Sequence, residues 1–140
     1  MLSQKAKYAL QALGYLAKHY KQDTPVLIGT IAKERSIPLK FLEAILCELR
    51  NNDILTSTRG RSGGYRLAEP PKKITLARVI RIIDGPIALL SCASLYFYKA
   101  CDNCNQQTCG VNPVMQEARD AILKVLEKRT VHDLMDKDHL

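Results

Sequence analysis

Residues 36–67 read SIPLKFLEAILCELRNNDILTSTRGRSGGYRL, and their pattern predicts a helix followed by a β-hairpin. Apolar residues recur at helical spacing in its first half, and Pro38 suits a first helical turn, where a missing N–H costs nothing. The pattern predicts a short amphipathic helix that ends at the polar residues 51–53. Its expected buried face comprises Leu39, Leu42, Ile45, Leu46 and Leu49. Three charged residues fall off that face, toward solvent or a ligand: Lys40, Glu43 and Arg50.

The second half of the stretch predicts a β-hairpin. Residues 54–59 are β-prone, residues 60–64 form a turn with three glycines, and residues 65–67 return as the second strand. Another short helix is predicted just upstream, over residues 28–35. Two short helices followed by a glycine-turned hairpin are typical of a winged helix-turn-helix. Two core helices and a hairpin without a role in DNA binding fit the same pattern.

The distribution of charge favours DNA binding. The chain of 140 residues carries a net charge of +7. Residues 1–81 contain 15 Lys or Arg against 6 Asp or Glu, whereas residues 82–140 contain 6 against 8. A basic first half and a mildly acidic second half indicate a nucleic-acid module joined to a different element. Charge alone does not decide the matter, because a basic face also serves solubility.

Most of the remaining chain is predicted to be helical. A first helix over residues 3–20 has Ser3 as its N-cap, and a later one runs from Thr75 to about Ile83. The apolar residues 87–90 are expected to pack under these helices.

A long helix is predicted to open at Pro113 and to run to about Arg129, followed by a short helix capped by Thr130. Its apolar face must pack on the first domain or on a second subunit, and helix-turn-helix proteins usually act as two-fold dimers. We therefore expect a homodimer, with packing against the first helix as the alternative. That face comprises Val114, Ala118, Ile122, Val125 and Leu126.

The predicted fold class is mainly α with a small β wing. It consists of a winged helix-turn-helix domain over residues 1–84, a linker with a cysteine-rich loop over residues 85–112, and a long C-terminal dimerisation helix with a tail over residues 113–140.

Four of the five cysteines fall within 18 residues of one predicted loop, with the spacing C-x8-C-x2-C-x4-C. Clustered thiols in a chain without secretory features indicate metal or redox chemistry more than structural disulfides. Thiolates bind zinc in tetrahedral sites, hold iron–sulfur clusters, or oxidise reversibly without a metal, and the spacing leaves all three open. The four candidate ligands are Cys92, Cys101, Cys104 and Cys109. Cys47, in the recognition helix, is expected to be a small packing residue.

These features together resemble the IscR/NsrR/CymR family of bacterial winged-helix transcription regulators. The matching segments include SQKAKYA (3–9), IPLKFLE (37–43), RGRSGGYRL (59–67) and IRIIDGP (80–86). The resemblance extends from the first residues to about Met135 and includes the downstream cysteine loop. It implies a homodimer on a double-stranded DNA operator, with the recognition helix in the major groove and the wing in the minor groove.

The resemblance also implies roles for individual residues. Lys40 and Glu43 become candidates for contacts to base edges, and Arg50 and Gly60 are further candidate DNA-binding residues. Arg59 and Arg61 become the minor-groove arginines of the wing, on either side of Gly60. The glycines Gly60, Gly63 and Gly64 are expected to adopt positive φ. The expected phosphate contacts are Ser3, Lys5 and Lys7.

In the metal-binding branch of the family, the cysteine loop holds an iron–sulfur cluster whose state changes DNA binding. The present sequence departs from the known ligand sets. Its loop has four cysteines and no histidine, and the region around Lys7 and Tyr8 offers no carboxylate. Either all four cysteines ligate or three do, and the cluster type, [2Fe–2S] or [4Fe–4S], stays open. Zinc is the alternative cofactor.

The sequence shows no nucleophile paired with a base and no phosphate-cradling glycine loop, so we expect no enzyme. Long uncharged apolar runs and a signal-peptide pattern are absent, which predicts a cytoplasmic protein without a membrane partner. An electron carrier and an architectural DNA-binding protein with structural zinc are the competing function classes.

Overall fold

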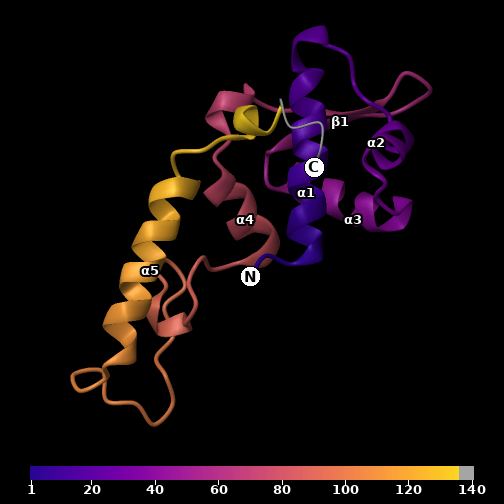
Figure 1. Ribbon diagram of the computed structural model, residues 1–140. Helices are drawn as coiled ribbons and strands as arrows, with labels where there is room; N and C mark the ends of the chain where they lie inside the picture. Colours follow the sequence, from indigo (N-terminus) through magenta and orange to yellow (C-terminus); the bar gives the residue numbers. More distant parts are fainter. Residues whose placement is uncertain (136–140) are drawn as a thin grey trace.

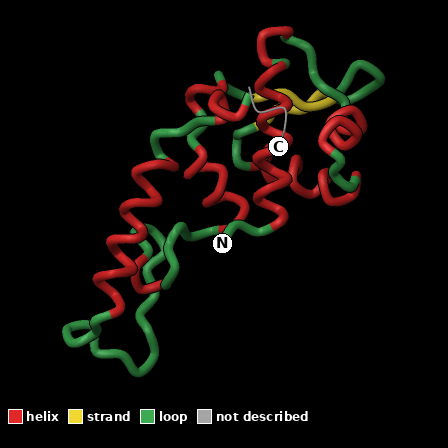
Figure 2. Tube along the Cα trace, in the orientation of Figure 1, coloured by secondary structure: helices red, strands yellow, loops and turns green. Residues whose placement is uncertain are grey.

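The computed structural model describes residues 1–135 (Figures 1 and 2). The tail beyond residue 135, the end of the predicted segment 113–140, lies outside the described residues. The helices are α1 (Gln4–Lys18), α2 (Ile28–Arg35), α3 (Leu39–Asn51), α4 (Leu76–Asp84) and α5 (Val111–Leu126), and the strands are β1 (Leu55–Thr58) and β2 (Gly64–Leu67). Short 3-10 turns lie at η1 (Tyr20–Gln22), η2 (Pro71–Lys73), η3 (Ser91–Ala93) and η4 (Val131–Leu134). Over residues 1–135, no helix is long and apolar enough to cross a membrane.

The centre of the fold is α1, which lies between the α2–α3 pair and α4 in Figure 1. Small and branched apolar side chains of α1 meet those of α2, α3, the wing and η4 in one core. Its largest fully buried side chains include Leu13, Leu16, Ile31, Leu42, Ile45, Leu46, Leu49, Ile54, Leu55, Ile74, Val79 and Val131. The predicted face of α3 is thus confirmed except at Leu39. This residue is 46% exposed, because it begins α3 before the helix reaches the core.

The predicted helix caps are present. The Ser3 hydroxyl accepts from the Ala6 N–H at 3.0 Å, and the Thr75 hydroxyl accepts from the Arg78 N–H at 3.2 Å. Thr130 and Asp133 form a reciprocal capping box at η4. Each cap supplies an acceptor to an N–H that has no partner within its helix.

The wing is a two-stranded antiparallel hairpin with Leu55 opposite Leu67 and Thr58 opposite Gly64. Gly60 and Gly64 have φ of +100° and +143°, as predicted. Gly63 is not in the positive-φ region, so that expectation was wrong. A side chain is excluded there for a different reason, because a Cβ on Gly63 would lie 2.2 Å from the Thr58 carbonyl oxygen.

Residues 85–126 form an arm that leaves the core along α5 (Figure 1). The predicted long helix begins two residues earlier than expected and ends at Leu126, three residues short of Arg129. Pro113 stands third in α5, where the first turn tolerates its missing N–H. Ile87, Ala88 and Leu90 are half-buried and Leu89 is 58% exposed, so the expected packing of residues 87–90 is only partial.

Candidate nucleic-acid interface and cysteine cavity

The outer side of α3 presents a polar surface next to the wing. Ser36 adopts a left-handed conformation with φ of +53°, and this residue turns the chain sharply from α2 into α3. Lys40 and Glu43 are both exposed on α3, as the sequence predicts. Two helices joined by a tight turn have the geometry of a helix-turn-helix motif.

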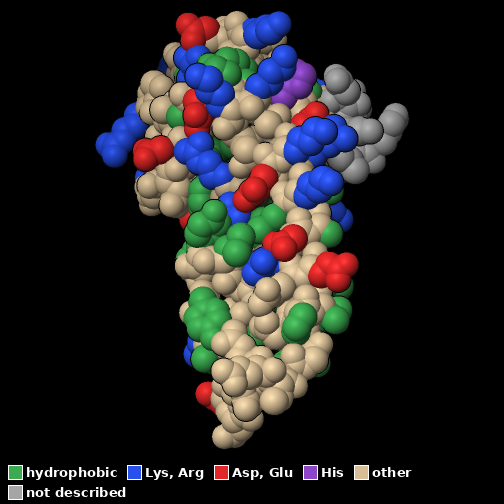
Figure 3. All heavy atoms as spheres, turned by 90° about the vertical axis from the view of Figure 1, so that its left-hand side faces the viewer, with side chains coloured by type: hydrophobic (Ala, Val, Ile, Leu, Met, Phe, Trp, Pro, Cys, Tyr) green, Lys and Arg blue, Asp and Glu red, His purple; other side chains and the backbone are tan. Residues whose placement is uncertain are grey.

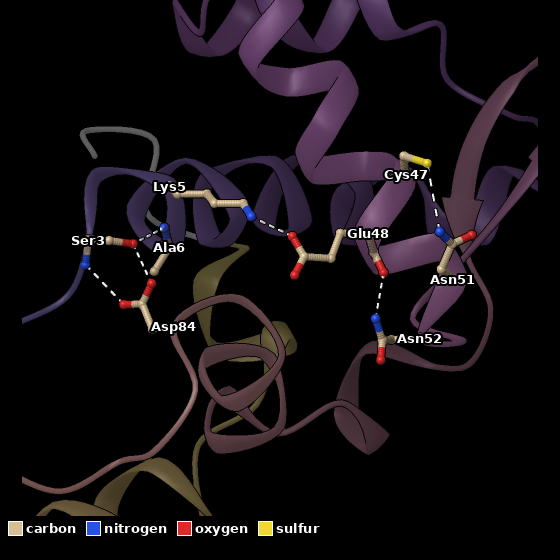
Figure 4. Close-up of polar contacts among 8 residues, drawn as sticks. All are labelled: Ser3, Lys5, Ala6, Cys47, Glu48, Asn51, Asn52 and Asp84. Carbon is tan, nitrogen blue, oxygen red and sulfur yellow. Dashed lines mark hydrogen bonds and ion pairs between the residues drawn. The ribbon is translucent and has the colours of Figure 1, made fainter. Parts of the chain in front are cut away.

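Arg50 lies between α3 and the wing. Its guanidinium donates to the Ser57 hydroxyl and to the Cys47 sulfur, each at 3.5 Å. The Asn51 amide also points to that sulfur, at 3.8 Å (Figure 4). Cys47 is therefore a half-buried residue of α3 whose sulfur contacts neighbouring side chains.

The three predicted phosphate contacts at the start of α1 differ in their surroundings, and Figure 4 draws two of them, Ser3 and Lys5. Ser3 donates to the Asp84 carboxylate through its backbone N–H at 2.9 Å and through its hydroxyl. Lys5 forms a 2.5 Å ion pair with Glu48 of α3. Lys7 is exposed. Within the protomer, Lys7 is thus the most available of the three for a phosphate.

The tip of the wing carries the two candidate minor-groove arginines. Arg59 and Arg61 are exposed on either side of Gly60. The base of the wing is fixed, because Val26 and Tyr65 exchange two backbone hydrogen bonds of 2.8 Å. A fixed base and an exposed basic tip suit insertion into a groove with negative potential.

The four loop cysteines line one cavity of about 70 Å³ at the far end of the arm. Cys92 lies on η3, Cys101 and Cys104 lie in the loop, and Cys109 lies just before α5. The Cys101 thiol donates to the Cys92 sulfur at 3.4 Å. The structure therefore brings all four predicted ligands together, across 18 residues of mostly irregular chain.

The thiols of this cavity differ in acidity. The hydrogen bond to Cys92 raises the pKa of Cys101 to about 11. A hydrogen bond to Cys109 raises the pKa of the Cys104 thiol. The pKa of Cys109 is lowered, because the backbone N–H groups of Asn112 and then Val111 donate to its sulfur at the start of α5. Among these three, Cys109 is the thiol most readily converted to the thiolate that binds metals.

Two polar residues of α5 hold η3 in place, and the sequence analysis missed both. Asn112 donates to the backbone oxygen and to the sulfur of Cys92, each at 3.3 Å. Arg119 donates to the Ala93 carbonyl oxygen at 2.7 Å. The available signal was weak: polar residues at helical spacing on one face of α5, namely Asn112, Gln116 and Arg119.

The donor set fits a thiolate-bound cofactor. Four soft sulfur ligands around one cavity suit an iron–sulfur cluster or tetrahedral zinc. Over residues 1–135, however, no three Cys, His, Asp or Glu side chains are already closed around a single ion position. Binding of one zinc ion would therefore draw the thiols inward, whereas a cluster of several atoms accepts more widely spaced ligands.

Comparison with known proteins identifies the family of this chain. Residues 2–137 match the Rrf2 family, described as an iron-dependent transcriptional regulator. An Rrf2-like HTH-type transcriptional regulator from Rhodobacter capsulatus is 39% identical over 138 residues, which covers 96% of this chain and 92% of that protein. IscR from Pectobacterium atrosepticum is 28% identical over 135 residues, covering 96% of this chain and 79% of that protein.

Solved structures give the same result. CymR of B. subtilis, the global cysteine regulator, superposes with a TM-score of 0.79 at 28% identity, covering 96% of this chain and 95% of that one. IscR of T. potens superposes with a TM-score of 0.76 at 25% identity, covering 98% of this chain and 87% of that one. The predicted winged-helix fold and the absence of an enzymatic role are confirmed by these relatives. The chain belongs to the Rrf2 family of helix-turn-helix transcriptional regulators.

Proposed function

We propose that this DNA-binding regulator acts as a homodimer on a double-stranded operator and that an iron–sulfur cluster in the cysteine cavity controls its affinity. One observation carries the proposal: all four loop thiols line a single cavity. The description of the family as iron-dependent, and the similarity to IscR proteins, support the choice of iron. When bound, the cluster supplies a redox-sensitive or iron-sensitive group at the end of the arm.

A metal-free thiol switch is the second candidate. The 3.4 Å separation of the Cys92 and Cys101 sulfurs supports it, because only a small movement brings the two atoms to bonding distance. Structural zinc is a third use of the same ligands. Metal analysis separates these alternatives.

The exposed side of α5 supports the homodimer. Apolar side chains on it are spaced three, eight and three residues apart, about one, two and one helical turns, and they are exposed within the protomer: Val111 at 55%, Val114 at 56%, Ile122 at 37% and Val125 at 55%. Figure 3, viewed from the α5 side, shows hydrophobic patches over the arm and basic side chains gathered at the opposite end. A second α5 laid against this stripe removes the apolar surface from water.

The proposed DNA contacts divide between α3, the wing and α1. Lys40 and Glu43 on α3 read base edges, Arg59 and Arg61 enter the minor groove, and Lys7 binds a phosphate. Ser3 and Lys5 are secondary phosphate contacts, because Asp84 and Glu48 already bind them. Arg50 orients the wing toward α3 through Ser57.

The control mechanism we propose is a shift between two populations of the dimer. Order in the loop between Cys92 and Cys109 fixes the start of α5, which bears the proposed dimer stripe. A change at the loop alters the spacing of the two recognition helices and hence the operator affinity, most simply as a repressor that the signal releases.

The test begins with anaerobic purification, an absorption spectrum, and assays of iron, sulfide and zinc. Binding sites are then selected from a random duplex library, and the affinity for the selected duplex is measured with loaded and metal-free protein. We expect near-stoichiometric iron and sulfide and a difference in affinity between the two forms. The double variant C101A/C104A is expected to remove that difference. A colourless protein with one zinc per chain would contradict the proposed sensor role, and only the proposed DNA-binding role would remain.

A further inference from the structure

Over residues 1–135, the buried polar residues are Ser94 and Asn112, and Asn112 has only 4% of its surface exposed. Its Nδ2 lies 3.3 Å from both the carbonyl oxygen and the sulfur of Cys92. Its Oδ1 accepts from the Gln116 Nε2 at 2.5 Å. A buried amide is costly unless its groups find partners, and here both ends of the side chain are satisfied.

The chemistry of these partners determines which end of the amide faces Cys92. A backbone carbonyl only accepts hydrogen bonds, and a thiolate only accepts them as well. The reversed orientation would place the Asn112 oxygen against two acceptors. The NH₂ group must therefore face Cys92, and Gln116 holds it in that orientation.

We propose that Asn112 is the positioning residue of the cysteine cavity. It ties Cys92 to the start of α5, and it stabilises negative charge on the Cys92 sulfur when the cavity is loaded. The first part stands on the contacts alone, whereas the second rests on the proposed cluster. One-electron reduction adds negative charge to a cluster and its thiolates, so a hydrogen bond to a ligand sulfur favours the reduced form and raises the reduction potential.

The position of Asn112 in the chain gives this bond a second consequence. Asn112 lies in the first turn of α5, and Arg119 binds Ala93 two turns later. Together they attach η3 to the helix that carries the proposed dimer stripe. Through Asn112, the Cys92 ligand and the dimer helix move as one unit.

The first experiment needs no cofactor. Hydrogen–deuterium exchange is followed over residues 90–94 in the metal-free full-length protein, in the wild type, Asn112→Leu and Asn112→Asp. Leucine has a similar size and no donor, whereas aspartate keeps the shape and replaces the donor by an acceptor. We expect exchange in this segment to be on the order of tenfold faster in both variants. Peptides from α1 and α3 report whether each variant is folded.

Asn105→Asp is the matched control. Asn105 lies in the same loop, and its side chain accepts from the Gln107 N–H rather than binding a cysteine. Exchange over residues 90–94 is expected to be unchanged in this variant. Unchanged exchange in both Asn112 variants would overturn the positioning role, whatever the cavity binds.

The second experiment measures the midpoint potential of the loaded protein by an anaerobic titration monitored spectroscopically. We expect the potential to fall in both Asn112 variants at equal iron and sulfide content and to stay at the wild-type value in Asn105→Asp. Equal potentials in all four proteins would overturn the charge-stabilising role. If the wild type takes up no iron and sulfide, the proposed cluster fails, and with it this second role. The exchange result then decides the positioning role alone.

Discussion

Arg81 of α4 donates a hydrogen bond to Glu127 at the end of α5 across 3.0 Å. The same guanidinium lies 4.8 Å from the ring centre of Tyr96, within the loop between Cys92 and Cys109. Three parts of the molecule meet at this side chain: the DNA-binding half, the proposed dimer helix and the cysteine-rich linker. A change in the loop has a direct physical route to α4 through Arg81.

The variant Arg81→Gln is expected to weaken the coupling between the cavity and DNA. The difference in operator affinity between loaded and metal-free protein should shrink by roughly fivefold, within the usual range of coupling energies. Stability should fall by less than about 1 kcal/mol, because the pair is partly exposed. Fluorescence anisotropy measures the affinities. Arg78→Gln is the control, since Arg78 pairs with Glu69. If Arg81→Gln kept the wild-type difference in operator affinity between loaded and metal-free protein, Arg81 would not couple the cavity to DNA binding.

The glycines offer a paired test of the wing. A Cβ on Gly64 would lie 2.2 Å from the Val26 carbonyl oxygen, at a φ of +143°. We expect Gly64→Ala to lower the free energy of unfolding by about 1–3 kcal/mol and to weaken DNA binding. Gly29 in α2 faces open space, so Gly29→Ala should stabilise by about 0.5–1 kcal/mol. Urea denaturation measures the free energy of unfolding of both variants. Equal changes in Gly64→Ala and Gly29→Ala would mean that the close contact between the wing and Val26 does not hold the wing in place.

The salt dependence of DNA binding tests the proposed phosphate contact of Lys7. Loss of one phosphate contact lowers the magnitude of the slope of log K against log salt by about 0.9. Lys7→Ala is expected to show that decrease. Lys124 of α5 lies on the arm, away from α3, and Lys124→Ala should keep the wild-type slope. An unchanged slope in Lys7→Ala would mean that Lys7 does not contact a DNA phosphate.

The capping box at η4 predicts a pH-dependent effect on stability. The backbone N–H of Thr130 donates to the Asp133 carboxylate and lowers the pKa of Asp133 below its ordinary value of 3.8. A carboxylate with a lowered folded-state pKa stabilises the protein above its unfolded-state pKa, and this contribution is lost as the pH falls through the folded-state value. Asp133→Ala should thus be less stable than wild type at neutral pH, and the gap should narrow below about pH 4. A stability difference between wild type and Asp133→Ala that did not change with pH would argue against a capping role for the Asp133 carboxylate.

The local elements of the DNA-binding half could be predicted from the sequence. Ser3 and Thr75 mark helix starts by their own side chains, and the glycine turn marks the wing. These signals act over three or four residues, which is the range over which capping and turn chemistry operate.

The pairings across the chain could not be predicted in this way. Lys5 and Glu48 are 43 residues apart, and Asn112 and Cys92 are 20 apart. Nothing in either local sequence specifies the partner, because the contact arises only when α1 meets α3 or when η3 folds onto α5. The shared site of the four cysteines could be predicted from their spacing. Four thiols in one short loop indicate metal or redox chemistry, which requires them to lie close together.

Control by the cysteine cavity is tested by the operator affinity of one anaerobic sample, measured before and after its iron is removed by a chelator. We expect iron and sulfide at the start and a change in Kd of about tenfold or more, equivalent to about 1.4 kcal/mol. The same Kd before and after removal would contradict control by the cysteine cavity.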